Sequence, residues 1–199
     1  MTRTRPVAPV VAAIAAGSLL SLAPPSSALV NPAVTIAGMA FAPARLTVPM
    51  GTTVTWTNED ATAHTATSDD GFFDTGSISA SGGTAEVTFR FSGRYRYHCS
   101  IHSTMHGQVV IPLEVVSGSA TDGWKLRWAS IPGPAGISYD VQYKRASASE
   151  WRTLRNDTLR PTGKFDPSRS GDYVVRSRTN NAAADDKSGW TPKVGLTIS

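Results

Sequence analysis

The chain has 199 residues, of which 40% are hydrophobic and 17% charged, and it contains 17 glycines, 13 prolines and a single cysteine. This composition is typical of a folded, turn-rich protein and excludes a wholly disordered chain, and the length allows one large domain or two small ones. The formal charge of +4 falls to about +2 when Arg3 and Arg5 of a predicted leader are left out, which is too little to indicate nucleic-acid binding.

Residues 1–28 are predicted to form a secretory signal peptide. Arg3 and Arg5 provide its positive end, an apolar run covers residues 7–23, and small residues at 26–28 offer a cleavage site after Ala28. The apolar run is short for a membrane span, so an uncleaved anchor is the less favoured alternative. We therefore expect a secreted or extracytoplasmic protein of the cell envelope, with no membrane span once the signal peptide is removed.

Beyond the leader, apolar residues alternate with polar ones, which is the period of a half-buried β-strand. Turns rich in glycine separate these segments, and no segment has a convincing amphipathic-helix pattern. Short strands at regular spacing indicate an antiparallel sandwich or barrel. In the first half of the chain the alternating residues are Val34 and Ile36, Leu46 and Val48, Val54 and Trp56, Val87 to Phe91, Tyr95 to Cys99, and Val109 to Val115.

A run of small residues at 117–120 is predicted to be a linker. The alternation then resumes at residues 124–128, 137–143, 173–175 and 194–198. We therefore expect an all-β protein with one β-sandwich over residues 31–116 and a second over residues 121–199.

The residues that could carry chemistry all lie in the first half. Cys99, His102 and Met105 follow one another at intervals of three residues, and His64 lies 35 residues before the cysteine. A thiolate, two imidazoles and a thioether form a soft donor set that fits a trigonal copper site with a weak axial methionine. A structural zinc site would favour more thiolates or histidines. The tight loop after Cys99 would return His102 and Met105 to the same ion.

The stretch from about Val34 to Val116 resembles the small blue copper proteins of the plastocyanin, pseudoazurin and amicyanin group, the cupredoxins. Besides the potential ligands, residues 41–43, 46–51, 54–58 and 73–76 match this group, and the Cys-x2-His-x2-Met loop is most similar to that of amicyanin. The resemblance implies a Greek-key β-sandwich that holds one type 1 copper ion. It also implies ligation by His64, Cys99, His102 and Met105, with electrons passing through the edge of His102.

Four further residues of this region need interpretation. Many relatives have proline where this chain has Ser103, and asparagine, which would brace the ligand loop, where it has Thr65. His98 precedes Cys99 and is expected on the opposite face of the strand, away from the metal. A His-Cys dipeptide relays electrons to a second metal in multicopper enzymes, but those require further histidines. His106 is expected to be a solvated turn residue.

Residues from about 119 to 199 resemble a fibronectin type III module, through the segments 126–128, 139–144, 173–180 and 188–190. The resemblance implies that Trp128 lies between the sheets and that Tyr173 begins the penultimate strand. Little chain remains for a first strand, which is then missing, very short or shared with the end of the first domain. We expect a spacer or stability module, since fold alone assigns no function. The alternative is docking to a redox partner or the cell surface through Lys144, Arg145, Arg152 and Arg155.

Together these features predict a secreted mononuclear blue copper protein that carries single electrons between redox protein partners. We expect a monomer without enzymatic activity, because four protein ligands leave no open position for a substrate. One alternative is an extracytoplasmic copper-binding or trafficking protein, although Met39, Met50 and Met105 are far apart in sequence and form no methionine cluster. The other is an interaction module with an empty copper site, against which the presence of all four ligand types argues.

Overall fold

The structure is a computed structural model that describes residues 32–199. The predicted signal peptide therefore lies outside the described residues. The regular secondary structure of residues 32–199 is β-strand alone, which confirms the expected all-β class. Over the same residues, no helix has the length and apolar character needed to cross a membrane.

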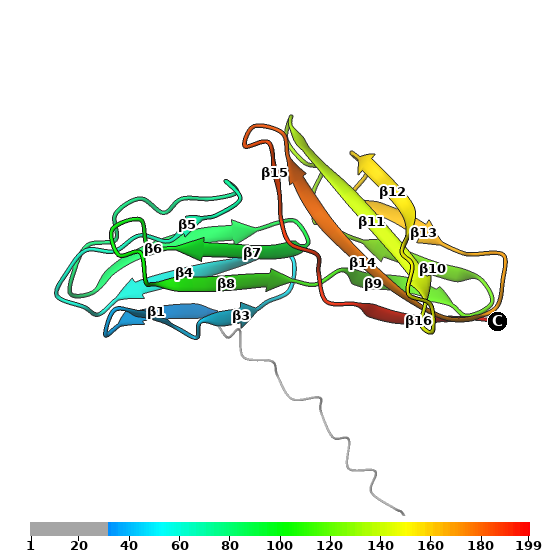
Figure 1. The fold of residues 1–199 in the computed structure, drawn as a ribbon, viewed down its shortest axis with the longest axis horizontal. Helices are drawn as coiled ribbons and strands as arrows, with labels where there is room; N and C mark the ends of the chain where they lie inside the picture. Colours follow the sequence, from blue (N-terminus) through cyan, green and yellow to red (C-terminus); the bar gives the residue numbers. More distant parts are fainter. Residues whose placement is uncertain (1–31) are drawn as a thin grey trace, which may run out of the picture. The chain divides into compact units, whose positions relative to one another are not determined.

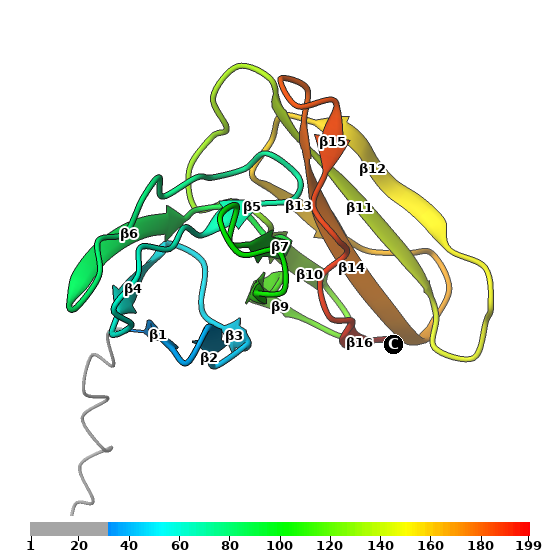
Figure 2. The same cartoon turned by 60° about the vertical axis from the view of Figure 1, so that its left-hand side comes forward.

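Strands β1–β8 form two four-stranded sheets, and Figures 1 and 2 show them as one group from two directions. The pairs β1–β4 and β3–β8 are parallel, which sequence alternation alone did not predict. Parallel partners require the chain to cross between the sheets before it returns. One sheet has the order β2 (Ala40–Ala42), β1 (Ala33–Ala37), β4 (Thr52–Asn58) and β6 (Gly83–Phe89); the other has the order β3 (Arg45–Thr47), β8 (His106–Ile111), β7 (Gly93–His98) and β5 (Thr67–Ser68).

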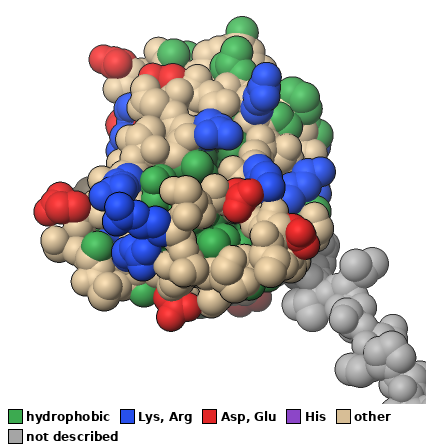
Figure 3. Space-filling view, turned by 90° about the vertical axis from the view of Figure 1, so that its right-hand side faces the viewer, with side chains coloured by type: hydrophobic (Ala, Val, Ile, Leu, Met, Phe, Trp, Pro, Cys, Tyr) green, Lys and Arg blue, Asp and Glu red, His purple; other side chains and the backbone are tan. Residues whose placement is uncertain are grey.

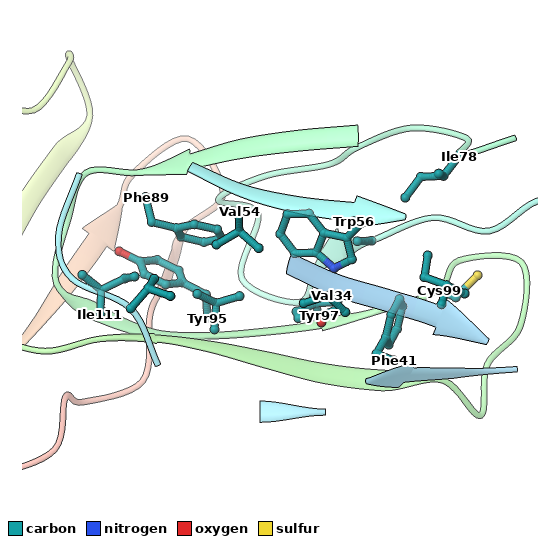
Figure 4. Packing of buried hydrophobic residues seen from close by; sticks show 14 of the residues in the cluster. Val34, Phe41, Val54, Trp56, Ile78, Phe89, Tyr95, Tyr97, Cys99 and Ile111 are labelled. Carbon is teal, nitrogen blue, oxygen red and sulfur yellow. The ribbon is translucent and has the colours of Figure 1, made fainter. Parts of the chain in front are cut away.

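The core of this first sandwich lies between its two sheets and is built by the alternating residues of the strands. Val34, Ile36, Val54 and Trp56 are fully buried, and Trp56 stacks edge-on against Tyr97 with ring centres 5.6 Å apart. Figure 4 shows Cys99 at one end of this cluster, away from Phe89 and Ile111. The apolar core therefore extends up to the cysteine.

Strands β9–β16 form a second group with its own core (Figures 1 and 2). Trp128, Tyr139 and Phe165 are among its fully buried side chains. One sheet has the order β13 (Thr162–Phe165), β10 (Gly123–Arg127) and β9 (Glu114–Ser119); the other has the order β12 (Arg152–Thr158), β11 (Ile137–Arg145), β14 (Gly171–Asn181) and β15 (Asp186–Lys187), with β16 (Val194–Ile198) also paired to β14.

The prediction of a linker at residues 117–120 was wrong for residues 117–119, which continue β9 and pair with β10. Small side chains carry no information about backbone hydrogen bonding, so the composition was misleading here. Gly118 has a φ of 123°, and a Cβ atom on it would lie 2.2 Å from the carbonyl oxygen of Gly123. The close approach of β9 to β10 at this position therefore requires glycine. Strand β9, the first strand of the second sandwich, thus begins at Glu114, within the residues 31–116 that were predicted for the first sandwich.

Residues 31–199 form one compact unit, and buried polar contacts join the two sandwiches. The hydroxyl groups of Ser92 and Ser177 lie 2.7 Å apart, and the Thr179 hydroxyl donates to the Ser92 carbonyl at 2.8 Å. Arg94 and Gly189 exchange two backbone hydrogen bonds of 2.9 Å. Ser92, Ser177 and Thr179 are buried, so the hydrogen bonds of their hydroxyl groups replace hydrogen bonds with water that are lost on folding.

Asp140 is the buried carboxylate of the second sandwich. It accepts hydrogen bonds from the Arg178 guanidinium at 3.0 Å, the Asn180 amide at 3.1 Å and the Asp157 backbone N–H at 3.1 Å, and the Lys187 ammonium lies 3.5 Å away. Burial alone would raise the pKa of Asp140, but these donors and charges outweigh it and hold the pKa below its ordinary value. The ionised form of Asp140 therefore stabilises the fold.

Asp70 has the opposite behaviour. Partial burial, together with the neighbouring carboxylates of Asp186 and Asp69, raises the pKa of Asp70 to about 6, although the charge of Arg96 opposes the shift. Ionisation of Asp70 therefore costs stability in the folded protein.

Candidate metal centre

Three side chains from separate segments of the first sandwich converge on one point. His64 lies after β4 and is held by two backbone hydrogen bonds with Ile78, while Cys99 directly follows β7 and His102 lies in the loop before β8. The Cys99 Sγ atom is 3.7 Å from His64 Nδ1 and 3.6 Å from His102 Nδ1, and the two Nδ1 atoms are 3.0 Å apart. Over the described residues, this is the single group of three or more His, Cys, Asp or Glu side chains in metal-binding proximity.

The separations of these donors fit a shared metal ion. Imidazole nitrogens and thiolate sulfurs bind a borderline metal at about 2.0–2.3 Å, so donors around one ion lie roughly 3–4 Å from one another. All three edges of the His64, Cys99 and His102 triangle fall in this range. One thiolate and two imidazoles are the donor types that suit copper or zinc, and the His2Cys combination suits trigonal copper.

The loop from Cys99 to Met105 turns back on itself every three residues. The His102 N–H donates to the Cys99 carbonyl at 3.2 Å, the Met105 N–H donates to the His102 carbonyl at 3.1 Å, and the Cys99 N–H donates to the Met105 carbonyl at 3.1 Å. These bonds bring Met105 near the three other residues, with only 1% of its surface exposed. Its role as a ligand remains a prediction.

The site is buried on one side and reachable from the other. His64 and Cys99 are fully buried, whereas His102 is half-buried and the neighbouring Ile101 is 53% exposed. Because the apolar core packs behind Cys99 (Figure 4), access to the donor atoms is from the His102 side.

Asp60 orients His64 from outside the triangle. Its Oδ2 atom lies 3.1 Å from His64 Nε2, and the Thr62 hydroxyl lies 3.3 Å from the same nitrogen, so Nδ1 is left to face the other donors. Backbone N–H groups of Gly38 and Met39 donate to the Asp60 carboxylate at 2.7 and 2.9 Å. The N–H of Met39 first, then that of Gly38 and the hydrogen bond with His64, outweigh desolvation and hold the pKa of Asp60 below its ordinary value.

Thr65 braces the cysteine and the loop that follows it. The Thr65 N–H donates to Cys99 Sγ at 3.3 Å, and the Ser100 N–H donates to the Thr65 hydroxyl at 2.8 Å. The threonine therefore supplies a bracing contact at the position where many relatives have asparagine. Asp60 was not predicted as a site residue, and the one signal for it in the sequence is its place four residues before His64.

The remaining histidines lie outside the triangle. As expected, His98 points away from the site: its side chain is 35% exposed and its Nδ1 atom lies 2.6 Å from Asp69 Oδ1. His106 is exposed as expected, but it is the first residue of β8 and pairs with His98 instead of lying in a turn. Strand β8 therefore begins at the residue that was expected to lie in the turn before it.

A β-sandwich with a buried cysteine and two histidines arranged around one point belongs to the class of small β-sandwich domains equipped to bind a metal. The family model described as a cupredoxin-like domain matches residues 10–111, about half of the chain, and the structure describes residues 32–111 of this match. The chain therefore belongs to the cupredoxin-like domain family.

Comparison with solved structures and curated sequences adds the following findings. A reduced Cu(I) form of an amicyanin mutant is 32% identical, with a TM-score of 0.38, and the match covers 40% of this chain and 80% of that chain. A purple cupredoxin from Nitrosopumilus maritimus is 30% identical, with a TM-score of 0.38, and the match covers 40% of this chain and 98% of that chain. No curated protein matches this chain.

Proposed function

We propose that this protein carries single electrons at one type 1 copper ion held by His64, Cys99 and His102, with Met105 as the weak axial ligand. The observation that carries the proposal is the triangle of one sulfur and two nitrogen atoms with edges of 3.0–3.7 Å. Membership of the cupredoxin-like family supports copper as the metal. The bound ion would supply exchange of one electron between Cu(I) and Cu(II).

The surrounding residues would keep the ligands in place while the charge of the centre changes. Asp60 and Thr62 fix the ring of His64, and Thr65 donates a hydrogen bond to the sulfur of Cys99. Ligands held by such contacts reorganise little, which favours rapid electron exchange. The partly exposed ring of His102 provides the path to a redox partner.

We propose no enzymatic role for this centre, because a fourth protein ligand at Met105 would leave no position for a substrate. The burial of Met105 supports this arrangement. We further propose that the protein is exported, acts as a monomer and exchanges electrons with other redox proteins, on the basis of its predicted signal peptide and its family.

For the C-terminal region we propose a fibronectin type III-like domain over about residues 121–199, after a copper domain over about residues 31–116. Two observations support the likeness. Trp128 is fully buried in the core, and the Tyr173 hydroxyl donates to the Arg169 carbonyl at 2.6 Å, as in the tyrosine corner of immunoglobulin-like sandwiches. Its role would be that of a spacer.

Docking is the second possible role of this domain. Figure 3 shows a cluster of Lys and Arg side chains on one face, with separate Asp and Glu side chains around it, which supports a partner that offers acidic groups to this cluster. Lys144 contributes least, because it donates to the Ala148 carbonyl and lies over the Trp151 ring, whereas Arg152 and Arg155 are exposed.

The test is to add Cu(II) to the purified protein and to record its visible absorption spectrum. We expect an intense thiolate-to-copper band that disappears in Cys99→Ser. Met105→Leu should retain the band and change the reduction potential. Met39→Leu is the matched control, because the Met39 side chain is 43% exposed and the substitution keeps the backbone N–H that donates to Asp60.

Each alternative function has its own outcome in this experiment. Binding of Cu(II) without the band would overturn the electron-transfer proposal in favour of copper trafficking. Absence of copper binding would leave an interaction module. Equal potentials for Met105→Leu and the wild type would remove Met105 from the ligand set.

A further inference from the structure

Two histidines that the proposed copper centre does not use face each other across the β7–β8 pair. His98 and His106 are directly opposite in the antiparallel register, where Cβ atoms lie about 4.5–5.5 Å apart. Their ring centres are 6.5 Å apart, and the ring planes are inclined by 50°. Both side chains are reached by solvent, so an ion from solution has access to them.

Asp69 holds the ring of His98 in a defined orientation. The 2.6 Å contact between Asp69 Oδ1 and His98 Nδ1 places the proton on Nδ1, which leaves Nε2 with its lone pair free. Metal-binding histidines in proteins are commonly fixed in this way, with a carboxylate on one ring nitrogen and the metal on the other. The pair therefore has both the spacing and the orienting carboxylate of a metal site.

The distance between the rings is compatible with a shared ion. Two imidazoles that bind one ion through nitrogens about 2.0–2.1 Å away have ring centres roughly 5–6.5 Å apart. The observed 6.5 Å is at the upper end of this range, so a small rotation about the side-chain torsions of His98 and His106 is sufficient.

Charges around the pair nearly balance. Arg96 lies two residues before His98 on the same strand, and it lines a shallow surface hollow together with Arg45, Asp69 and His106. Asp70 adds a second carboxylate next to Asp69. Attraction of a cation by the local field is therefore weak, and the imidazoles must provide the affinity.

We propose that His98 and His106 form a second, surface metal site for a borderline divalent cation such as Zn(II) or Cu(II), with Asp69 as the positioning residue and water completing the coordination. Imidazole donors suit these ions and disfavour Mg(II) and Ca(II). The site lies on the outer face of β7, whereas Cys99 belongs to the buried centre, so the two sites use different residues throughout.

Calorimetric titration of the full protein with Zn(II) tests the site. We expect His106→Gln to bind one equivalent fewer than the wild type, while His102→Gln also loses one equivalent but at the other centre. Asp69→Asn should weaken the surface site about 10-fold, because the ring of His98 is no longer fixed. Asp70→Asn is the matched control, since it removes the neighbouring charge without a contact to His98.

Nuclear magnetic resonance of the imidazole side chains in the wild type gives a second readout that needs no variant. Zinc should shift the signals of His98 and His106 in addition to any change at His64 and His102. Equal stoichiometry for the wild type and His106→Gln, or zinc-induced shifts confined to His64 and His102, would overturn the proposal.

Discussion

Replacing Asp60 by asparagine should weaken copper binding although all four proposed metal ligands are retained. The Oδ2 atom of Asp60 contacts both His64 Nε2 and the Met39 N–H, while Oδ1 accepts from the Gly38 N–H. An asparagine has only one acceptor oxygen, so it must give up either the turn at Gly38 or the bond to His64. Loss of a group that orients a metal-binding histidine typically lowers metal affinity about 10–100-fold, and we expect a change in this range.

The assay is competition for Cu(II) between the protein and a chelator of known affinity. Glu59→Gln is the matched control: it removes one negative charge from the adjacent exposed position, and no side-chain hydrogen bond of Glu59 occurs among residues 32–199. The control should bind as the wild type does. If both variants lose affinity equally, then the lost charge, and not the orientation of His64, determines binding at this position. If Asp60→Asn binds copper as tightly as the wild type, Asp60 does not position His64.

Three predictions concern stability, and denaturant unfolding measures each. Asp140→Asn should lower the free energy of unfolding by about 1–3 kcal/mol at pH 7; because folding depresses the pKa of Asp140, the wild type loses this advantage as pH falls below about 4. Asp70→Asn should raise the free energy of unfolding at pH 7. The pKa of Asp70 is about 6 in the folded protein against 3.8 ordinarily, so the wild type loses stability as the pH rises from about 4 to about 6, and the variant should not. Ser177→Ala leaves the buried Ser92 hydroxyl without its 2.7 Å partner and should cost about 1–3 kcal/mol, much of which the double variant with Ser92→Ala should recover.

The proximity of Cys99, His102 and Met105 could be predicted from sequence because one short loop carries all three residues. A loop of this length cannot carry His102 far from Cys99, whatever the rest of the fold. His64 required more: its distance from Cys99 depends on how two sheets pack, and neither the strand order nor the parallel β1–β4 pair can be deduced from alternation. The resemblance to a known family supplied what periodicity lacked.

The supporting residues escaped prediction for a different physical reason. Asp60 and Thr65 act through single hydrogen bonds whose partners are set by loop conformation, and polar residues in a loop have many possible partners. The pairing of His98 with His106 depends on strand register, and a shift by one residue would place one of the two on the opposite face. Such a register is fixed only by the three-dimensional packing of the strands.

The polar contacts between the two sandwiches bear on how the second one acts. A flexible tether would let the proposed metal centre and the second sandwich move independently, but Arg94 and Gly189 exchange backbone hydrogen bonds and Ser92 is fully buried against Ser177. Separation would expose these groups, and residues 112–113 alone lie between the end of β8 and the start of β9, which leaves little slack at the junction. The second sandwich therefore moves together with β7, the strand that Cys99 directly follows. This junction fits the spacer role proposed for the second sandwich, and it indicates that the spacing is fixed rather than variable.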